Sequence, residues 1–174
     1  MSTNRWIDLL PALHKPMPIL SFPSASLMGV SVYNLTHDAA VQTEGIVRVA
    51  METDAAAAVT MMDLSVEAEA FGCTLHTAEN EVPTVVGALV TDEDEAEALS
   101  IPTVGDARTG LYIEAAQNAK ARITDRPVLA GVIGPFSLAG RLMDVTEALA
   151  NCICDPDFVH AVLRKTTPFL IAYA

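Results

Sequence analysis

The apolar positions of this chain fall into two patterns, one typical of buried strands and one typical of helices. Residues 54–63 and 128–133 are short, almost wholly apolar runs, which predict strands buried on both faces. A proline-punctuated run at residues 18–22 predicts a further strand, and residues 73–76 and 83–90 have strand character. Fully apolar strands that alternate with helices indicate a parallel sheet covered on both sides, either an open doubly wound sheet or a (β/α) barrel.

Helical spacing of apolar residues, together with capping residues, predicts the helices. Thr36 and Thr91 are expected to cap two of them, and Asp155 followed by Pro156 predicts the start of the last one. Pro168 is expected to kink or end that helix, because proline removes a hydrogen bond from a helix interior. The predicted helices cover residues 6–13, 35–53, 91–99, 111–123, 143–154 and 155–174, and a turn-rich linker covers residues 102–110.

Composition and charge narrow the class of protein. The chain has 174 residues, enough for one domain with a sizeable core, and 51% of them are hydrophobic. Its net charge is −12 and it has no basic cluster, which argues against binding to nucleic acid or to an anionic membrane surface. No apolar stretch reaches the roughly 20 residues of a membrane span, and the N-terminus lacks the pattern of a signal peptide. We therefore expect a cytoplasmic protein.

Side chains at the ends of the predicted strands are the first candidates for chemistry, because active sites of parallel α/β folds gather there. They are Asp63, residues 134–137 and residues 21–24. A carboxylate at a strand end can act as an acid, a base or a charge partner. Asp63 can also cap the helix that begins near Ser65, and composition alone favours the cap.

The two glutamates that follow Asp63, and the possible metal ligands, carry weaker signals. Glu67 and Glu69 are two residues apart and cannot share one helix face, so at most one is expected to point to a site. Four histidines are scattered along the chain, and Cys73 with His76 would make half a metal site at best. Cys152 and Cys154 lie in an apolar context that favours thiols of the core, and all three cysteines are expected to be reduced. No serine has a recognisable base partner, and no glycine-rich phosphate loop is present.

Three segments in this order and separation resemble the uroporphyrinogen decarboxylase superfamily: "MDLSVEAEAFGC", "AGVIGPFSLAGRL" and "DPDFVHAVLRK". The likeness is closer to its corrinoid-dependent branch, the methylcobamide:coenzyme M methyltransferases, where "VEAEALG" and "GPFTLA" segments recur. The resemblance runs from Trp6 to the end of the chain. It implies an α/β fold of the TIM (β/α)8 barrel type, with the site at the carboxyl ends of the strands. Because a complete barrel takes about 250 residues, residues 1–174 are expected to be a single, incomplete domain, the N-terminal half of such a barrel.

The resemblance also implies roles for residues. In the decarboxylase branch an aspartate after the second strand holds the pyrrole nitrogens of the tetrapyrrole, and Asp63 falls on that position. Arginines after the first strand pair with substrate carboxylates in that branch, but "SFPSASLMGVSVYN" contains none, and the branch's tyrosine after the third strand falls on Arg141. Asp63 is therefore the catalytic candidate, and no residue is assigned to a metal. The substrate-binding candidates are Ser21, Ser24, Gly134, Pro135, Phe136, Ser137 and Arg141.

The methyltransferase branch implies zinc and a corrinoid. Its zinc is held by a His-x-Cys pair and a later cysteine in the second half of the barrel, and no His-x-Cys occurs here. The expected function is methyl transfer from a methylated corrinoid protein to a thiol such as coenzyme M, without activity in the absence of the second half. The implied partners are a corrinoid protein, the second barrel half or another copy of the chain. The alternatives are a uroporphyrinogen decarboxylase of porphyrin biosynthesis and a non-catalytic half-barrel that binds a partner chain.

Overall fold

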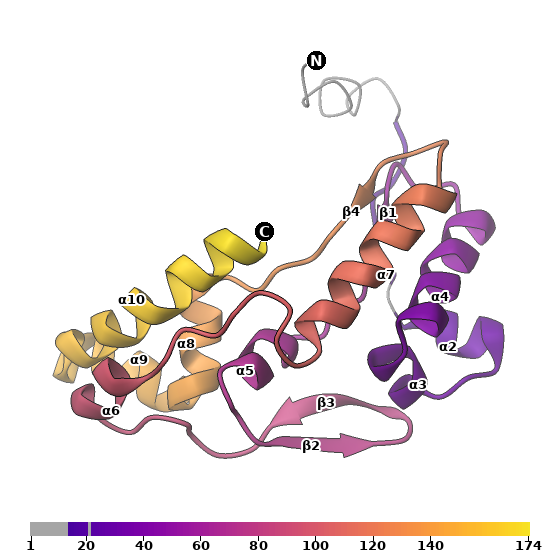
Figure 1. Ribbon diagram of the computed structural model, residues 1–174. Helices are drawn as coiled ribbons and strands as arrows, with labels where there is room; N and C mark the ends of the chain where they lie inside the picture. Colours follow the sequence, from indigo (N-terminus) through magenta and orange to yellow (C-terminus); the bar gives the residue numbers. More distant parts are fainter. Residues whose placement is uncertain (1–13, 21) are drawn as a thin grey trace. The chain divides into compact units, whose positions relative to one another are not determined.

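The protein is described by a computed structural model for residues 14–20 and 22–174, which divide into two compact units (Figure 1). The first unit comprises the described residues up to Met62 together with Leu111–Gly131, and the second comprises Asp63–Gly110 and Val132–Ala174. The elements are α2 (Pro23–Met28), α3 (Val32–His37), α4 (Ala39–Glu52), β1 (Ala58–Val59), α5 (Val66–Ala70), β2 (Leu75–Ala78), β3 (Glu81–Val85), α6 (Glu93–Ala98), α7 (Thr109–Arg122), β4 (Val128–Leu129), α8 (Pro135–Met143), α9 (Val145–Cys154) and α10 (Pro156–Tyr173).

In the first unit, α4 packs against α2, α3 and strand β1. Strands β1 and β4 pair in parallel, with Ala58 opposite Val128 and Val59 opposite Leu129. The buried core joins α4, β1 and α7, so helices cover the parallel pair as the apolar sequence of its strands predicts. Its members are Ile46, Val47, Ala50, Ala58, Ala119 and Ile123.

Both parallel strands are much shorter than the apolar runs that predict them, with two residues each. Beyond the pair, the N–H of Thr60 donates to the carbonyl of Leu129 at 3.0 Å, and the hydroxyl oxygen of Thr60 accepts the N–H of Gly131 at 3.0 Å. A side chain thus replaces a backbone acceptor and ends the ladder. A Cβ at position 131 would lie 2.3 Å from the sulfur of Met62, so a larger residue there would require the methionine side chain to move.

The strand predicted at residues 18–22 is wrong. Neither residues 18–20 nor residue 22 belong to a strand, and Pro23 begins helix α2. The carbonyl of Pro16 accepts the N–H of Ala56 at 2.8 Å, but Pro16 and Pro18 have no N–H of their own, which prevents a regular ladder. The helix predicted over residues 6–13 lies outside the described residues.

The helix predicted over residues 35–53 is two helices, because Asp38 interrupts it. Asp38 has an extended backbone, and its Oδ1 accepts the N–H groups of Ala40 at 2.8 Å and Val41 at 3.1 Å, so it caps α4. Thr36, the predicted cap, lies inside α3 instead, where its hydroxyl donates to the carbonyl of Val32 at 3.0 Å.

Capping at α6 also differs from the prediction by one residue. Asp92, not Thr91, accepts the N–H of Glu95, at 2.8 Å. Glu95 in turn accepts the N–H of Thr91, the residue before the N-cap, at 2.8 Å, which is one residue away from the pairing of a regular capping box.

The start of α10 is confirmed. Asp155 caps the helix by accepting the N–H of Phe158 at 3.3 Å, and Pro156 is its first residue. The helix does not end at Pro168 but continues to Tyr173. The strand character predicted at residues 73–76 and 83–90 is confirmed in part by the antiparallel hairpin of β2 and β3, but residues 86–90 are not in a strand.

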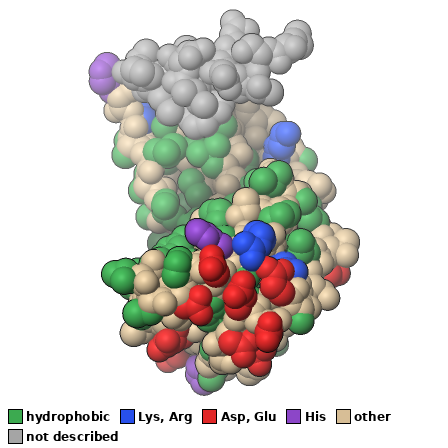
Figure 2. Space-filling view, turned by 90° about the vertical axis from the view of Figure 1, so that its left-hand side faces the viewer, with side chains coloured by type: hydrophobic (Ala, Val, Ile, Leu, Met, Phe, Trp, Pro, Cys, Tyr) green, Lys and Arg blue, Asp and Glu red, His purple; other side chains and the backbone are tan. Residues whose placement is uncertain are grey.

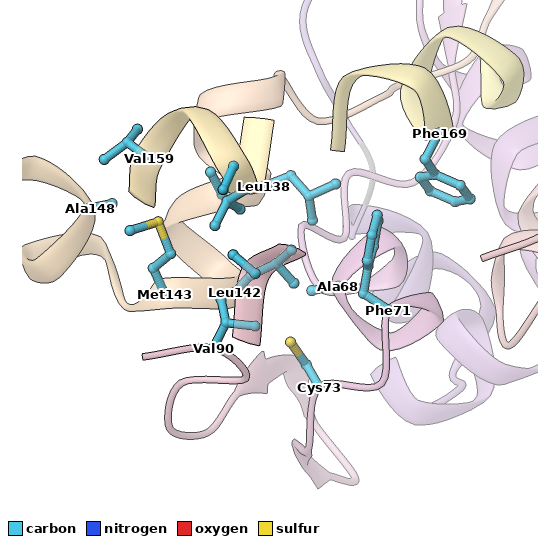
Figure 3. Close-up of a cluster of buried hydrophobic side chains, with 14 of the residues drawn as sticks. Ala68, Phe71, Cys73, Val90, Leu138, Leu142, Met143, Ala148, Val159 and Phe169 are labelled. Atoms are coloured by element: carbon cyan, nitrogen blue, oxygen red, sulfur yellow. The ribbon is translucent and has the colours of Figure 1, made fainter. Parts of the chain in front are cut away.

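The second unit has the larger core, in which α10 packs against α6, α8 and α9 (Figure 1). Figure 3 shows its side chains converging from α5, α8 and α10, with Leu138 and Leu142 fully buried. Phe71 meets Phe169 edge to face, with 5.3 Å between ring centroids and 79° between planes. This core anchors α5 and the turn that precedes it, where the buried polar residues of the unit gather.

Candidate functional site

Asp63 forms a turn just before helix α5. Its side chain has no exposed surface, and its Oδ1 accepts the N–H of Ser65 at 2.9 Å and the hydroxyl of Ser65 at 2.6 Å. This is the turn that a short acidic side chain forms with the backbone two residues further on. The N-cap residue of α5 is Ser65, which makes no side-chain capping bond. The cap interpretation of Asp63 is therefore wrong, and Asp63 orders the turn instead.

Arg108 connects this turn to α5. Its Nη1 lies 2.5 Å from Asp63 Oδ2, its Nη2 donates to Ser65 Oγ at 2.8 Å, and its Nε lies 2.6 Å from Glu69 Oε2. The arginine side chain is only 7% exposed. One planar guanidinium thus uses its fork of donors to hold two carboxylates and a hydroxyl in a buried network.

The charges of this network depend on one another. Burial alone would lower the pKa of Arg108, but the charges of Asp63 and Glu69 and their hydrogen bonds to the guanidinium raise it overall. Arg108 is therefore a permanent cation in this site. Because a buried charge without its partner is strongly unfavourable, the loss of Arg108 would leave the carboxylate of Asp63 uncompensated.

Glu67, on α5, is the second buried carboxyl of the site after Asp63. It is 3% exposed, and its Oε1 accepts the N–H of Ile133 at 3.1 Å. Burial raises the pKa of Glu67, hydrogen bonds from backbone N–H groups oppose this in part, and the charge of Asp63 raises it further. Glu67 thus keeps its proton to a higher pH than an exposed glutamate. Through Ile133 it also ties α5 to the start of α8.

Tyr173, near the end of α10, adds a second group that keeps its proton. Its ring stacks on that of Phe169, with 5.8 Å between centroids. Burial, and then the negative charges of Glu67 and Asp63, raise the pKa of its hydroxyl. The hydroxyl stays neutral and remains a hydrogen-bond donor under ordinary conditions.

Glu67 and Glu69 have separate surroundings, as expected of two residues that do not share one helix face, and that at most one of them points to a site stays a prediction. Helix α5 is only five residues long, and its two glutamates bind different partners, Ile133 and Arg108, within the second unit. Helical spacing alone does not indicate that both glutamates have partners, because these partners approach the short helix from more than one side. Arg108 is missed as well, since residues 102–110 read as a linker. The sequence contains one indication of a role for Arg108: it is the only lysine or arginine between Arg48 and Lys120.

The predicted substrate-binding residues differ in burial and in the unit to which they belong. The segment expected as a loop after the third strand is the start of α8, with Gly134 as N-cap and Pro135 as first residue, because proline suits that position. Phe136 is 38% exposed, and Ser137 and Arg141 are exposed on α8. Ser24 is fully buried on α2 of the first unit, and Ser21 lies outside the described residues. Their role in substrate binding stays a prediction.

The cysteines differ in their surroundings. Cys73 is buried, its thiol donates to the carbonyl of Arg141 at 3.9 Å, and burial raises its pKa to about 11. Cys152 and Cys154 are exposed, so their prediction as core thiols is wrong: α9 buries Ala148 instead. Among the residues that the structure describes, no three His, Cys, Asp or Glu side chains are grouped to hold a metal ion. The described residues therefore do not fit the zinc site that the resemblance implies.

None of the described helices is long and apolar enough to span a membrane.

Comparison with known proteins agrees with the resemblance. The sequence profile of the family "Uroporphyrinogen decarboxylase (URO-D)" matches residues 7–174. The methylcobamide:CoM methyltransferase MtbA of Methanosarcina acetivorans is 29% identical over 114 residues, which are 64% of this chain and 33% of that protein. The methylated-thiol–coenzyme M methyltransferase of Methanosarcina mazei is 29% identical over 113 residues, which are 64% of this chain and 30% of that protein. The chain spans about a third of the length of these relatives.

A solved structure, a methyltransferase from Methanosarcina mazei, has the same fold. It matches with a TM-score of 0.81 at 21% identity, over 95% of this chain and 52% of the other. The predicted fold, part of a TIM barrel of this type, is confirmed. Since the family profile matches nearly the whole chain, the protein belongs to the uroporphyrinogen decarboxylase family.

Proposed function

We propose that this chain is part of a corrinoid-dependent methyltransferase, which moves a methyl group from a methylated corrinoid protein to a thiol such as coenzyme M. The observation that carries the proposal is the similarity to relatives whose names state a methylcobamide and CoM as substrates. In this reaction the electron pair of the cobalt–carbon bond stays on cobalt, the thiol loses its proton, and its sulfur forms the new bond to the methyl carbon. The protein has to position the two reactants and accommodate one proton.

The described residues suit the positioning part of this work. Both oxygens of Asp63 are engaged, by Ser65 and by Arg108, so we assign Asp63 to holding the guanidinium rather than to binding substrate. The network holds α5 through Glu69, and α5 in turn places the carboxyl of Glu67 against the residues that precede α8. Glu67 is the group we assign to holding a proton, because it is buried and keeps its proton to higher pH.

The thiol-activating zinc of the family has no fitting ligand cluster among the described residues. We therefore derive no step through zinc, and we propose that methyl transfer requires further sequence that brings a His-x-Cys pair and a later cysteine. The relatives' greater length supports this part of the proposal.

The decarboxylase alternative is less well supported. An octa-acid tetrapyrrole needs cations for its carboxylates, and the segment "SFPSASLMGVSVYN" has no arginine. Arg108 is buried and bound to Asp63, Ser65 and Glu69, so it offers no replacement for them.

The test is a methyl-transfer assay of the purified chain, alone and mixed with the polypeptide from the same source that carries a His-x-Cys pair and a later cysteine. Methylcobalamin and coenzyme M are the substrates, and the methylated thiol is quantified by mass spectrometry. We expect product from the mixture only, with less product for Asp63→Asn and an unchanged amount for Asp94→Asn, an exposed acid of α6. Equal product from the chain alone would overturn the requirement for the second polypeptide. Decarboxylation of uroporphyrinogen without methyl transfer, or neither activity, would overturn the proposed reaction.

A further inference from the structure

Tyr173 lies near the end of α10, on the same helix face as Phe169. Its ring stacks on that of Phe169, with 9° between the planes. Phe169 is 1% exposed and meets Phe71 edge to face, and Figure 3 shows these two rings next to each other. Phe71 directly follows α5, and its N–H donates to the carbonyl of Glu67 at 3.3 Å. A series of three aromatic rings thus connects Tyr173 to the helical turn that carries Glu67.

The hydroxyl of Tyr173 is an uncommitted donor. It forms no hydrogen bond within the part of the chain that the structure describes. The charges of Glu67 and Asp63 both act on this hydroxyl, and that of Glu67 acts more strongly. Asp63 needs no further donor, because its two oxygens are engaged by Ser65 and Arg108. The hydroxyl is therefore available to Glu67.

Glu67 lacks a side-chain donor. Its carboxyl accepts hydrogen bonds from backbone N–H groups, among them that of Ile133 at 3.1 Å, and from no side chain of the described residues. The donors of Arg108 serve other members of the network. Figure 2 shows exposed acidic side chains gathered on one face of the molecule, where water solvates their charges. Glu67 is 3% exposed, so its ionised form depends on donors that the protein supplies.

We propose that Tyr173 is a positioning residue for Glu67: its hydroxyl donates a hydrogen bond to the carboxylate when Glu67 has released its proton. The inference rests on the proposed function, which assigns Glu67 to holding a proton. Only the proton of Glu67 moves, because the O–H bond of Tyr173 stays intact and no electrons are transferred. A neutral donor suits this role, since it stabilises the ionised carboxylate without bringing a charge that would compete with Arg108 for Asp63.

Groups from four segments then act on Glu67, and their effects on its pKa differ. The charge of Asp63 raises this pKa, whereas the N–H of Ile133 and the charge of Arg108 lower it. A hydrogen bond from Tyr173 to the ionised carboxylate would lower it further. Because the phenol is neutral, removing its hydroxyl changes the pKa of Glu67 without altering the charge of the site.

The experiment follows the titration of Glu67 in the purified chain by NMR, with glutamate isotope-labelled at its side-chain carboxyl and the resonance assigned through Glu67→Gln. Tyr173→Phe removes the hydroxyl and keeps the ring, and we expect it to raise the pKa of Glu67 by about one pH unit. Tyrosine fluorinated next to its hydroxyl, placed at position 173, is a stronger donor and should lower that pKa. The matched control is Tyr33→Phe in the first unit, which removes the hydroxyl of a tyrosine that also stacks on a ring, that of His37, and should leave the titration unchanged.

Tyr173→Phe should keep the circular dichroism and the unfolding midpoint of the unaltered chain, because the ring and its stacking are retained. An unchanged pKa of Glu67 in this variant would overturn the proposal. If the variant is less stable than the unaltered chain, the fluorinated tyrosine decides, because it keeps the hydroxyl. A lowered pKa of Glu67 then supports the proposal, and an unchanged one overturns it.

The titration needs neither corrinoid nor thiol, so its result is independent of the proposed reaction. In the methyl-transfer assay of the mixture, Tyr173→Phe should move the pH profile to higher pH by the same amount as the pKa of Glu67, and Tyr33→Phe should not move it. A titration shift without any methyl transfer would support the pairing of Tyr173 with Glu67 and overturn the proposed reaction. Methyl transfer with an unchanged titration would support the reaction and overturn the pairing.

Discussion

Helices α5 and α6 contain the same four residues, Glu-Ala-Glu-Ala, in two different environments. In each helix the alanine between the two glutamates is fully buried, Ala68 in α5 and Ala96 in α6. The two tetrapeptides thus use the same small residue to pack against the core of the second unit. Their glutamates differ in what they meet.

In α5, Glu67 is buried and binds a backbone N–H, whereas Glu69, with 29% of its side chain exposed, pairs with the buried Arg108. In α6 the second glutamate, Glu97, pairs with the exposed Arg164 at 2.5 Å. Burial raises the pKa of Glu67, whereas the hydrogen bond from Arg164 lowers the pKa of Glu97. The first glutamate of the α5 segment and the second glutamate of the α6 segment therefore carry pKa shifts of opposite direction, because the surrounding chain supplies a dry interior to one and an exposed cation to the other.

The largest expected effect comes from removing the cation of each environment. Arg108→Met should lower the free energy of unfolding by about 3–5 kcal/mol, because it leaves the buried carboxylate of Asp63 unpaired. Arg164→Met should leave the urea midpoint nearly unchanged, since an exposed ion pair contributes little. Both are measured by urea unfolding, with Arg108→Lys to separate loss of charge from loss of the planar fork. Similar losses for the two methionine variants would contradict the contrast between the helices.

The shared alanine gives a smaller effect that should be alike in both helices. Ala68→Leu and Ala96→Leu each overfill a fully buried position and should each cost about 1–3 kcal/mol. Thermal unfolding measures this, with Ala98→Leu on the exposed side of α6 as a control that should cost less. A tolerated leucine at only one of the two buried positions would show that the helices do not pack alike.

A still smaller effect is expected from the helix cap, because α6 has a side-chain cap, Asp92, and the N-cap residue of α5 makes no such bond. Asp92→Ala should lower the free energy of unfolding by about 1 kcal/mol, because Asp92 accepts the N–H of Glu95. Asp94→Ala removes a neighbouring acid that is not the N-cap residue and should cost less. Chemical denaturation of the two variants in parallel tests the difference, and equal costs would argue that charge and not capping is responsible.

The smallest expected effect is a change in how stability depends on pH. The pKa of Glu67 is raised above 4.5, so its contribution is present below that pH and lost as pH rises through the folded-state pKa. Glu67→Gln should therefore gain on the unaltered chain as pH rises. The pKa of Glu97 is lowered below 4.5, so its contribution is lost as pH falls, and Glu97→Gln should gain on the unaltered chain in acid. Urea unfolding over a pH series measures both slopes, and slopes of the same sign would refute the assignment.

Much of the fold could be predicted from sequence, because capping residues and apolar patterns act within short segments. The start of α10 followed from Asp155 and Pro156, whose capping and backbone preferences act within one helical turn. Caps were misplaced by one or two residues at α4 and α6, where two polar residues compete and the backbone selects one of them. The lengths of β1 and β4 were overestimated from their apolar sequences. A strand extends only as far as it pairs with a neighbouring strand, and an apolar sequence does not show where that pairing ends.

The candidate site was predictable only at Asp63, which a strand end and a family motif both marked. Arg108 lies 45 residues further along the chain, and nothing local indicates that it returns to Asp63. Glu67 could be recognised as a glutamate on a helix but not as a buried one, because its burial depends on the approach of Ile133. Such contacts join distant segments, so they arise only when the chain has folded.

By itself, the sequence determined the family, the alternation of helices with apolar strands, the position of Asp63 and the acidic character of the chain. These properties belong to single residues or to short segments, and they act over one or two turns of backbone. The tertiary structure alone decided which carboxylates are buried, which two of them pair with Arg108 and which apolar face of α9 remains in contact with water. Burial and ion pairing depend on neighbours brought together across the chain, and such neighbours raise the pKa of Glu67 in one Glu-Ala-Glu-Ala segment and lower the pKa of Glu97, at a different position, in the other.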